Sequence, residues 1–386
     1  MPPLPDLLPA RVRVIDSHTI GEPTRLVIDE AFAAALPLGS GSVRQRRDAF
    51  RTGFDHLRRA VVADPRGVEA MVGVVLVPPA DPACDLGAFY FNRVGYLDMC
   101  GHATIGLAVS LGHLGRIEPR AFRLETPAGV VGVEWHGGTA ATFQCVPPRR
   151  IHRGLAVSLD DGTTVTGDVA TSGLWFFITR DHGLPLEPAA IPQLKDKAWA
   201  IRRALEAAGI TGDAGETIDH VVLLGPPREP GHDARNFVLC PDGAFDRSPC
   251  GTATSALVGC LREDGLLAEG KVWRQESILG GLYEATIRRA GGVFVPSVRG
   301  HAWITAESTL HFAADDPYRT GLGSELKWWA SSPLLAQGGF DCAGCDRHTS
   351  PPPRAGGMPR VTHASRRDSW SSRSSTNRIT SGETLS

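Results

Sequence analysis

The sequence predicts a mixed α/β protein built from two homologous lobes, and an internal repeat is the main reason. Cys100–Thr104 reads CGHAT and Cys250–Thr254 reads CGTAT, so the copies start 250 − 100 = 150 residues apart. Each copy opens an apolar stretch with a helical pattern. A second pair of segments, Glu125–Gly129 and Glu276–Gly280, is offset by 276 − 125 = 151 residues. Two repeats with nearly the same spacing favour a duplicated fold over coincidence.

The first half contains apolar stretches that are typical of strands, together with one charged stretch of helical spacing. In that helical stretch Phe50, Phe54 and Leu57 recur so that they share one face. A polar segment at 17–25 lies between two apolar stretches and is expected to be a loop. The expected elements, in order, are strands at 12–16 and 26–28, a helix at 43–60, strands at 72–77 and 87–91, and a helix from about 100 to 114.

The second half repeats this mixture. Its expected elements are strands at 130–135, 141–146 and 174–178, a helix at 191–208, strands at 220–224 and 236–240, and a helix from about 250 to 263. Two further strands, near 293–297 and 309–313, are placed so that they can return to the first lobe. We therefore expect lobe 1 at 11–128, completed by about 298–322, and lobe 2 at 129–297.

The chain changes character after about residue 325. From Thr349 to Ser386 it is rich in Ser, Arg, Pro, Gly and Thr and has few large apolar residues. Such a segment buries too little apolar surface to offset the entropy of ordering it. We expect 325–386 to be disordered, either as an unselected extension or as a basic interaction tail.

Composition excludes several classes of protein. The 386 residues suffice for two domains, and 42% hydrophobic with 21% charged residues is ordinary for a folded protein. A formal net charge of −2 gives no basic field for nucleic acid or an anionic membrane. No apolar run approaches the roughly 20 residues that span a bilayer, and Met1–Pro5 lacks the features of a secretory signal. We expect a cytoplasmic protein without a disulfide framework.

Cys100 and Cys250 each stand directly before a glycine at the start of an expected helix. The first N–H groups of a helix have no partner within it, and the helix dipole is positive there. Both effects favour a thiolate, so we expect lowered thiol pKa values. The same N–H groups offer a cradle for a carboxylate. A lone cysteine is more often a small buried apolar residue, but two in repeated contexts favour paired acid–base groups that move a proton between two faces of one carbon.

Three further polar residues are candidates for contacts with a ligand. His102 lies two residues after Cys100 and is placed to hydrogen-bond to the thiol or to the ligand. Asp246 lies four residues before Cys250, where it can pair with an ammonium group or cap a turn. His220 stands at the head of an apolar strand, where a structural role is nearly as well supported.

Other polar residues leave their role open. The side chains of the segment 17–25 that either line a cleft or pair with one another are His18, Glu22, Thr24 and Arg25. Cys342 and Cys345 have a C-x-x-C spacing, but no second such motif completes a zinc site, so we expect no metal. No phosphate loop or dinucleotide fingerprint stands out, and we expect no cofactor. The cysteines beside apolar stretches, which we expect to be structural, are Cys84, Cys145, Cys240 and Cys260.

The motifs around the two cysteines resemble signatures of the proline racemase family. They are Met99–His102 and Asp246–Thr252, and Asp16–Arg25 resembles the N-terminal signature of that family. The segments Arg235–Pro241 and Trp273–Ile278 are most similar to its 4-hydroxyproline 2-epimerase branch. The resemblance extends from about residue 11 to about 321. It implies a fold like that of diaminopimelate epimerase, with two pseudo-symmetric lobes, each a β-barrel-like sheet around a central helix.

The resemblance also implies a site and a reaction. It places the catalytic cysteines at Cys100 and Cys250. It places the substrate-binding positions at Gly101, His102, His220, Asp246, Gly251 and Thr252. The implied reaction is cofactor-independent inversion of the α-carbon of 4-hydroxyproline, from the trans-L to the cis-D form, by two-base proton transfer between the lobes. The implied partner is a small imino acid, hydroxyproline or proline, with assembly as a homodimer left open.

Several alternatives share this site. They are a proline racemase, a trans-3-hydroxyproline dehydratase, a diaminopimelate epimerase and an inactive homologue that binds imino acids. The dehydratase branch of the family lacks the second cysteine, so Cys250 favours epimerisation. The sequence departs from the family pattern at Ile20 and Ala253, where glycine is usual, and at Ser172–Trp175. None of these departures removes a catalytic group.

Overall fold

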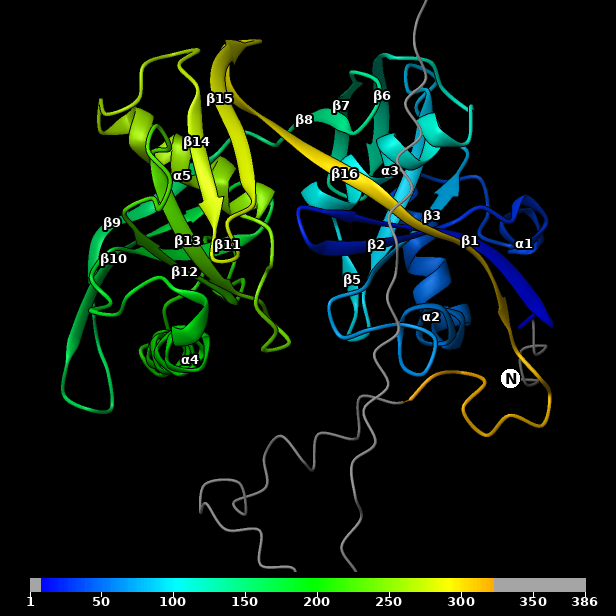
Figure 1. Ribbon diagram of the computed structural model, residues 1–386, viewed down its shortest axis with the longest axis horizontal. Coiled ribbons are helices and arrows are strands. Elements are labelled where there is room, and N and C mark those ends of the chain that lie inside the picture. The colour runs from blue at the N-terminus through cyan, green and yellow to red at the C-terminus, as the bar shows by residue number, and fades with distance from the viewer. Residues whose placement is uncertain (1–7, 323–386) are drawn as a thin grey trace, which may run out of the picture. The chain divides into compact units, whose positions relative to one another are not determined.

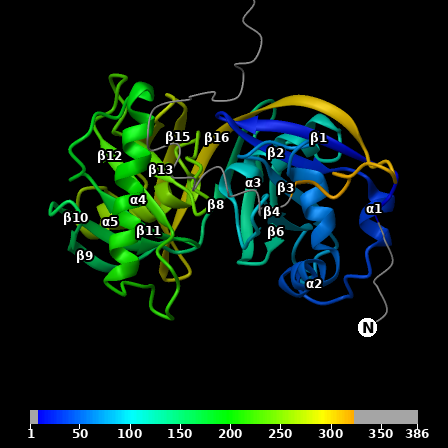
Figure 2. The same cartoon turned by 90° about the horizontal axis from the view of Figure 1, so that it is seen from below.

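The structure is a computed structural model that describes residues 8–322. The tail expected at 325–386 and the C-x-x-C motif lie outside these residues. Figures 1 and 2 show two groups of strands, one gathered about helix α3 and the other about helix α5. None of the helices within residues 8–322 is both long enough and apolar enough to span a membrane.

The first half of the chain begins with a hairpin and ends with the strand β8. Its elements are β1 (Arg11–Thr19), β2 (Glu22–Val27), α1 (Glu30–Ala35), α2 (Val43–Val62), β3 (Val72–Val77), β4 (Leu86–Phe91), β5 (Tyr96–Leu97), α3 (Gly101–His113), β6 (Arg120–Thr126), β7 (Gly129–Trp135) and β8 (Ala140–Gln144). The expectation of a loop at 17–25 is wrong, because β1 and β2 pair through most of this segment and a two-residue turn joins them. Its polar side chains fit into strands because they find partners there. Arg25, for example, donates hydrogen bonds of 2.8 and 2.7 Å to the carboxylate of Asp16.

The second half ends with one unusually long strand. Its elements are β9 (Arg149–Ser158), β10 (Thr164–Thr171), β11 (Trp175–Thr179), η1 (Pro188–Ala190), α4 (Ile191–Ala207), β12 (His220–Gly225), β13 (Ala234–Leu239), α5 (Gly251–Glu263), β14 (Trp273–Ser277), β15 (Leu282–Ala290) and β16 (Val293–His311). The strands expected near 293–297 and 309–313 belong to this single strand β16. Pro296 and Gly300 interrupt the apolar pattern of the sequence without ending the strand.

The two halves repeat one strand order. The neighbours are β2-β3-β4-β6-β7-β8 in the first half and β11-β12-β13-β14-β15-β16 in the second. In each series the first and third pairings are parallel, and the others are antiparallel. A shared order with shared directions is what an internal duplication produces. The predicted fold class, two pseudo-symmetric α/β halves with barrel-like sheets, is confirmed.

The strand β16 belongs to both halves of the sheet. It pairs with β15 through residues 293–299 and with β8 through 297–301. Beyond that point it pairs with β1 through 302–311, with an irregularity of register on the way. Within residues 8–322 the last strand therefore closes the first half beside the first strand. The lobe boundaries expected from the sequence stay a prediction.

Each half encloses one helix and is covered by another. Residues 101–111 of α3 and 251–261 of α5 are all buried, because small and apolar side chains occupy every face of these helices. Strands β1, β2, β7, β8 and β16 contact α3, and β9, β10, β15 and β16 contact α5. The amphipathic helices α2 and α4 instead contact the equivalent strand pairs β3–β4 and β12–β13. Figure 1 shows α2 and α4 at the lower side of the view, apart from the enclosed helices α3 and α5.

The repeated glutamate of the first half binds the backbone of the loop between β3 and β4 and the start of α2. Glu125, on β6, is 7% exposed. Its carboxylate accepts hydrogen bonds from the backbone N–H groups of Val43, Ala80 and Asp81 at 3.0, 2.6 and 3.0 Å. Val43 opens α2, and the other two donors lie in the loop between β3 and β4. Burial raises the pKa of Glu125, but the three donors more than offset it, so the pKa is lowered.

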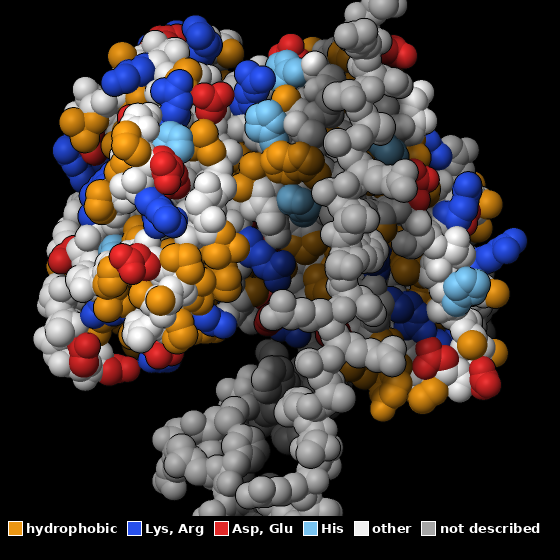
Figure 3. All heavy atoms as spheres, viewed as in Figure 1, with side chains coloured by type: hydrophobic (Ala, Val, Ile, Leu, Met, Phe, Trp, Pro, Cys, Tyr) orange, Lys and Arg blue, Asp and Glu red, His pale blue; other side chains and the backbone are white. Residues whose placement is uncertain are grey.

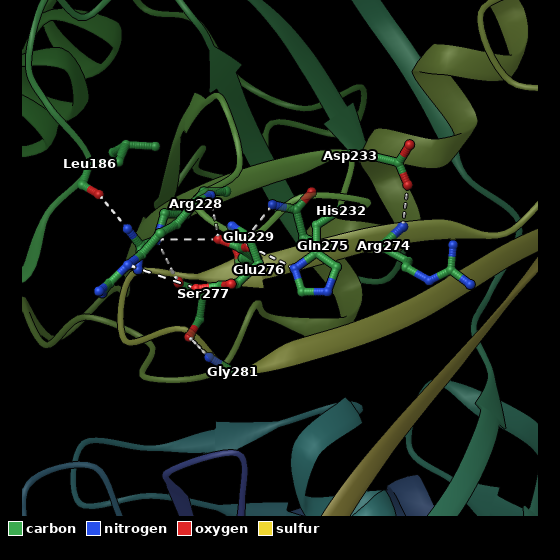
Figure 4. A network of polar contacts seen from close by, with 11 residues as sticks. Leu186, Arg228, Glu229, His232, Asp233, Arg274, Gln275, Glu276, Ser277 and Gly281 are labelled. Carbon is green, nitrogen blue, oxygen red and sulfur yellow. Dashed lines mark hydrogen bonds and ion pairs between the residues drawn. The ribbon is translucent and has the colours of Figure 1, made fainter.

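Its counterpart in the second half, Glu276 on β14, does the same for the loop between β12 and β13 (Figure 4). The carboxylate accepts hydrogen bonds from the N–H groups of Arg228 and Glu229 at 2.9 and 2.8 Å. The Nδ1 atom of His232 lies 2.6 Å from it and the Nε atom of Arg235 3.7 Å. Glu276 is completely buried. The duplicated glutamate thus keeps one structural role, and in the second half an imidazole and a guanidinium also lie beside it.

Candidate active site

The two repeated cysteines stand where the two enclosed helices begin and touch. Cys100 precedes the first residue of α3 and Cys250 that of α5. A Cβ atom on Gly101 would lie 2.6 Å from the ring of Phe143 and 3.3 Å from the Cα atom of Gly251. A Cβ atom on Gly251 would lie 2.6 Å from the same ring and 3.4 Å from the Cα atom of Gly101. Only glycine lets both helix starts meet over this fully buried ring.

Both thiols are buried, with exposed fractions of 8% for Cys100 and 7% for Cys250. Burial raises the pKa of both thiols, and the charge of Asp246 raises them further. Backbone N–H groups at each helix start act in the opposite direction, but they do not overcome the burial. The expectation of lowered thiol pKa values is therefore wrong in this structure. Loss of water around a buried thiolate outweighs the helix N-terminus.

The backbone differs between the two cysteines. Cys100 is extended, with φ −141° and ψ 114°. Cys250 has φ 59°, in the left-handed region, which costs a residue with a side chain about 1–2 kcal/mol. The turn before Cys250 holds it there. Asp246 Oδ1 accepts hydrogen bonds from the N–H and the hydroxyl of Ser248 at 2.8 and 2.7 Å, and Ser248 Oγ accepts one from the N–H of Cys250 at 3.2 Å.

The residues two positions after each cysteine face its sulfur. The Nδ1 atom of His102 lies 3.4 Å from Sγ of Cys100, and Oγ1 of Thr252 lies 3.5 Å from Sγ of Cys250. Burial lowers the pKa of His102 to about 4, so its ring is neutral near pH 7. Each thiol thus has an uncharged hydrogen-bonding neighbour from the same position of the repeat.

Asp246 and His220 lie next to these thiols. Asp246 is 7% exposed, and burial raises the pKa of its carboxyl against the hydrogen bonds from Ser248. His220, also buried, is close enough for its charge to act on the pKa of Asp246. Its Nδ1 atom lies 2.6 Å from Asp219, and its ring packs at 5.1 Å from that of Phe176. The structure brings the predicted site residues into one region, while their roles stay a prediction.

A second carboxylate, Glu22, reaches this region from the first half. It is the first residue of β2 and is 6% exposed. Its Oε2 atom accepts a hydrogen bond of 2.9 Å from the N–H of Arg247 in the second half. Burial raises the pKa of Glu22 well above its usual range, and the charge of Asp246 raises it further. The alternative pairing of Glu22 with Arg25 is not formed, because Arg25 pairs with Asp16.

Tyr283, on β15, is a site residue that the sequence did not indicate. It is completely buried, and its hydroxyl has no hydrogen-bond partner of acceptable geometry within residues 8–322. Burial and then the charge of Asp246 raise the pKa of this hydroxyl, the neighbouring side chain of Ser248 acts against them, and Cys250 and Cys100 add smaller raising effects. Tyr283 lies within a strand of alternating burial, so its sequence context gave no signal. Cys240, expected to be structural, also lies within electrostatic reach of Asp246.

The turn between β1 and β2 meets the second half. Ile20 has φ 52° and Gly21 φ 94°. A Cβ atom on Gly281, in the turn between β14 and β15, would lie 1.6 Å from Cγ2 of Ile20, so this side chain packs directly on the glycine backbone. The departure from glycine at position 20 therefore adds an apolar contact between the halves. His18, by contrast, stacks on Trp303 at 5.3 Å.

On the face shown in Figure 3, basic and acidic side chains are interspersed rather than separated by sign. Among the residues that the structure describes, His, Cys, Asp and Glu side chains form no group that could hold a metal ion.

Known proteins match nearly all of the described chain. The proline racemase family model matches residues 14–323. A 4-hydroxyproline 2-epimerase of Roseibium aggregatum is 46% identical over 314 residues, which are 81% of this chain and 99% of that relative. A 4-hydroxyproline 2-epimerase of Xanthomonas campestris pv. campestris is 47% identical over 312 residues, which are 81% and 98% of the two chains.

Solved structures agree on the fold. A hydroxyproline epimerase of Agrobacterium vitis with bound trans-4-OH-L-proline superposes with a TM-score of 0.72 at 21% identity, covering 81% of this chain and 95% of that one. A probable proline racemase of Agrobacterium radiobacter with bound carbonate gives 0.72 at 20% identity, covering 82% and 98%. Structural similarity at 20–21% sequence identity supports the fold alone. With the family model and the relatives above, it places the chain in the proline racemase family.

Proposed function

We propose that this chain is a cofactor-independent 4-hydroxyproline 2-epimerase, which converts trans-4-hydroxy-L-proline to cis-4-hydroxy-D-proline. The observation that carries the proposal is the meeting of two helix starts, each preceded by a buried cysteine, over the ring of Phe143. Inversion at one carbon needs an acid and a base on opposite sides of it. Relatives that carry this name match at 46% and 47% identity over almost their whole length.

In this proposal the two thiols exchange roles with the direction of the reaction. One of Cys100 and Cys250 removes the α-proton as a thiolate, and the other donates a proton to the opposite face as a thiol. The carbon loses its C–H bond on one side and gains one on the other, so no electron acceptor or cofactor is needed. The two thiols then hold one proton between them throughout and titrate as a pair.

The groups around the thiols would bind the two charges of the imino acid. The N–H groups at Gly101–His102 and Gly251–Thr252 would hold the carboxylate and the negative charge that grows on it in the transition state. Asp246 would hold the ring ammonium. Because burial and Asp246 raise the pKa of both thiols, a nearby ammonium is the charge that favours a thiolate again.

The proposal includes the finer expectations from the sequence. Two lobes, expected from the sequence at 11–128 with 298–322 and at 129–297, would close on the substrate and exclude water. The protein would work in the cytoplasm on a small imino acid, as a monomer or a homodimer. The preference for a 4-hydroxyl group over plain proline rests on the names of the relatives.

The test is turnover in deuterium oxide, followed by NMR and optical rotation. The panel is trans-4-hydroxy-L-proline, L-proline and trans-3-hydroxy-L-proline. We expect inversion of the first, with deuterium at the α-carbon of the product, and much slower reaction of the second. Inversion without deuterium would contradict thiol bases that exchange with solvent. Loss of water from the third would favour the dehydratase, and binding of all three without turnover would favour the inactive homologue.

A further inference from the structure

The site contains two buried carboxylates, one from each half, although one ammonium group needs only one of them. Glu22 comes from the hairpin of the first half and Asp246 from the turn before α5. Their exposed fractions are 6% and 7%. The charge of Asp246 raises the pKa of Glu22, and two buried carboxylates that repel each other in this way disfavour being charged together without a cation.

We propose that Glu22 is a second carboxylate of the ammonium site and holds a proton when no ligand is bound, which it releases to solvent when a ring ammonium binds. This inference rests on the proposed function and adds a residue and a proton to it. In the bound site Glu22 and Asp246 would both be anionic and would face the ammonium from the two halves. The proton that leaves Glu22 goes to water or buffer, so charge is balanced.

The contacts of Glu22 place it at the site. It follows the turn at Ile20 and Gly21, and its Oε2 atom accepts the hydrogen bond from the N–H of Arg247, the residue next to Asp246. Thr19, its pairing partner in the hairpin, donates a hydrogen bond of 2.8 Å to the carbonyl oxygen of His102 at the start of α3. The carboxylate is thus fixed between the two helix starts.

The electrostatics agree with a proton on Glu22 and not on Asp246. Asp246 accepts two hydrogen bonds from Ser248, which favour its charged form. Within residues 8–322 Glu22 accepts a single hydrogen bond, from the N–H of Arg247, and burial and the charge of Asp246 raise its pKa. The titratable and charged groups that act on Glu22, or on which Glu22 acts, are Asp242, Asp246, Arg247, Cys100 and Cys240. Arg247 is the cation among them, and its charge does not overcome burial and Asp246.

The hydroxyl of Tyr283 is a further buried polar group beside Asp246. It is completely buried, and the side chain of Ser248 and the charge of Asp246 both act on its pKa. Within residues 8–322 it still forms no well-aligned hydrogen bond. A polar group of the substrate beside Asp246 would give this hydroxyl a partner.

The experiment counts protons on binding. The ligand is a pre-equilibrated mixture of trans-4-hydroxy-L-proline and cis-4-hydroxy-D-proline, so that binding heat is measured without net conversion. Titration calorimetry at pH 7 in two buffers of different ionisation enthalpy gives the protons released per site. Ammonium binding also favours loss of one thiol proton in every variant, so the contribution of Glu22 is the difference between proteins: we expect Glu22→Gln to release about one proton fewer per site than the wild type. Glu22→Gln retains an oxygen that can accept from Arg247, so a purely structural role would leave both the affinity and the proton count unchanged.

Kinetics separate a binding role from a structural one. The ammonium is present in both the ground state and the transition state, so Glu22→Gln should raise KM by about 10- to 100-fold and change kcat little. Glu22→Asp should still release the proton but bind the ligand more weakly. This variant allows the inference to be tested even if Glu22→Gln does not fold. Glu134→Gln, the same change at an exposed position on β7, is the matched control and should match the wild type.

Two results would overturn the inference. One is a wild type that inverts 4-hydroxyproline and binds it without proton release. The other is a Glu22→Gln variant that releases as many protons as the wild type, with the release lost only in Asp246→Asn. If the wild type inverts none of the panel, the proposed function itself fails, and the two failures are told apart by the NMR experiment alone.

Discussion

The two helix starts share a motif and a position in the repeat, yet their surroundings differ. Cys100 has an extended backbone and a neutral histidine beside its sulfur. Cys250 has a left-handed backbone held by a hydrogen-bonded turn, and a threonine beside its sulfur. The two sulfur atoms are therefore duplicated, whereas the side chains around them are not. The proposed reaction would use both features, because it needs two equivalent thiols for the proton and one carboxylate for an ammonium on one side of the ring.

The largest expected effect comes from replacing one of the two thiols, which makes the two sides of the site different. Cys100→Ser and Cys250→Ser should each lower kcat/KM for epimerisation by about 10²- to 10⁴-fold, because a serine hydroxyl is a much weaker base at neutral pH. In deuterium oxide, each variant should still exchange the α-hydrogen of one epimer faster than that of the other, and the preferred epimer should differ between the variants. NMR of the separate epimers measures this. The same preference in both variants would contradict thiols on opposite faces.

The second comparison concerns the duplicated glutamates. Glu276→Ala leaves Arg235 buried without its carboxylate and should lower the free energy of unfolding by about 3–5 kcal/mol. Glu125→Ala leaves backbone N–H groups without an acceptor and should cost about 2–3 kcal/mol. Urea unfolding of both variants at pH 7 measures the difference. A larger loss for Glu125→Ala would show that Arg235 and His232 add little to the cost of removing Glu276.

Acid should lower the free energy of unfolding through Glu125 in the first half and Glu276 in the second. The pKa values of Glu125 and Glu276 are lowered in the folded protein, because backbone N–H donors outweigh burial. A lowered folded pKa stabilises the protein above the unfolded value of about 4.3 and loses this stabilisation as the pH falls through the folded value. We expect the free energy of unfolding to fall below about pH 4.5, and to fall less steeply in Glu276→Gln. A wild-type stability that does not change between pH 6 and pH 3 would contradict this.

The smallest effect tests the contact between the helix starts. Gly101→Ala and Gly251→Ala each place a Cβ atom against the ring of Phe143 and should cost about 1–3 kcal/mol. Because the two glycines face each other almost symmetrically, the two costs should agree within about 1 kcal/mol. Adding Phe143→Leu should restore part of the loss in both. Thermal unfolding measures these shifts, and an effect confined to one glycine would mean that the two helix starts are not equally constrained.

The repeat made the architecture predictable, since a duplicated motif and a second pair at nearly the same offset are visible without any structure. Strand continuity was harder to predict. Pro296 and Gly300 are residues that often end strands, yet β16 continues through both because its neighbours on either side supply pairing partners. The polarity of segment 17–25 predicts a loop, but Arg25 lies opposite Asp16 in the hairpin and also donates a hydrogen bond to the carbonyl oxygen of Val61, a contact that the sequence does not reveal.

The candidate site residues could be predicted where they lie within a sequence motif. Properties that depend on burial in the folded chain could not be predicted. The cysteines, glycines, His102, Thr252 and Asp246 follow from the two motifs. The direction of the thiol pKa shifts does not, because local sequence indicates a helix start but not how much water surrounds it. Tyr283 lies in a strand of the second half with no motif around it, so only the folded chain brings its hydroxyl toward Asp246.

The placement of β16 has a consequence for synthesis on the ribosome. One edge of β1 pairs with β2 as soon as the hairpin emerges, but its other edge is completed by residues 302–311, which are made almost 300 residues later. Until then the N-terminal half has an open strand edge, which invites pairing with other nascent chains. Translation of β16 is thus the step that completes the pairing of β1.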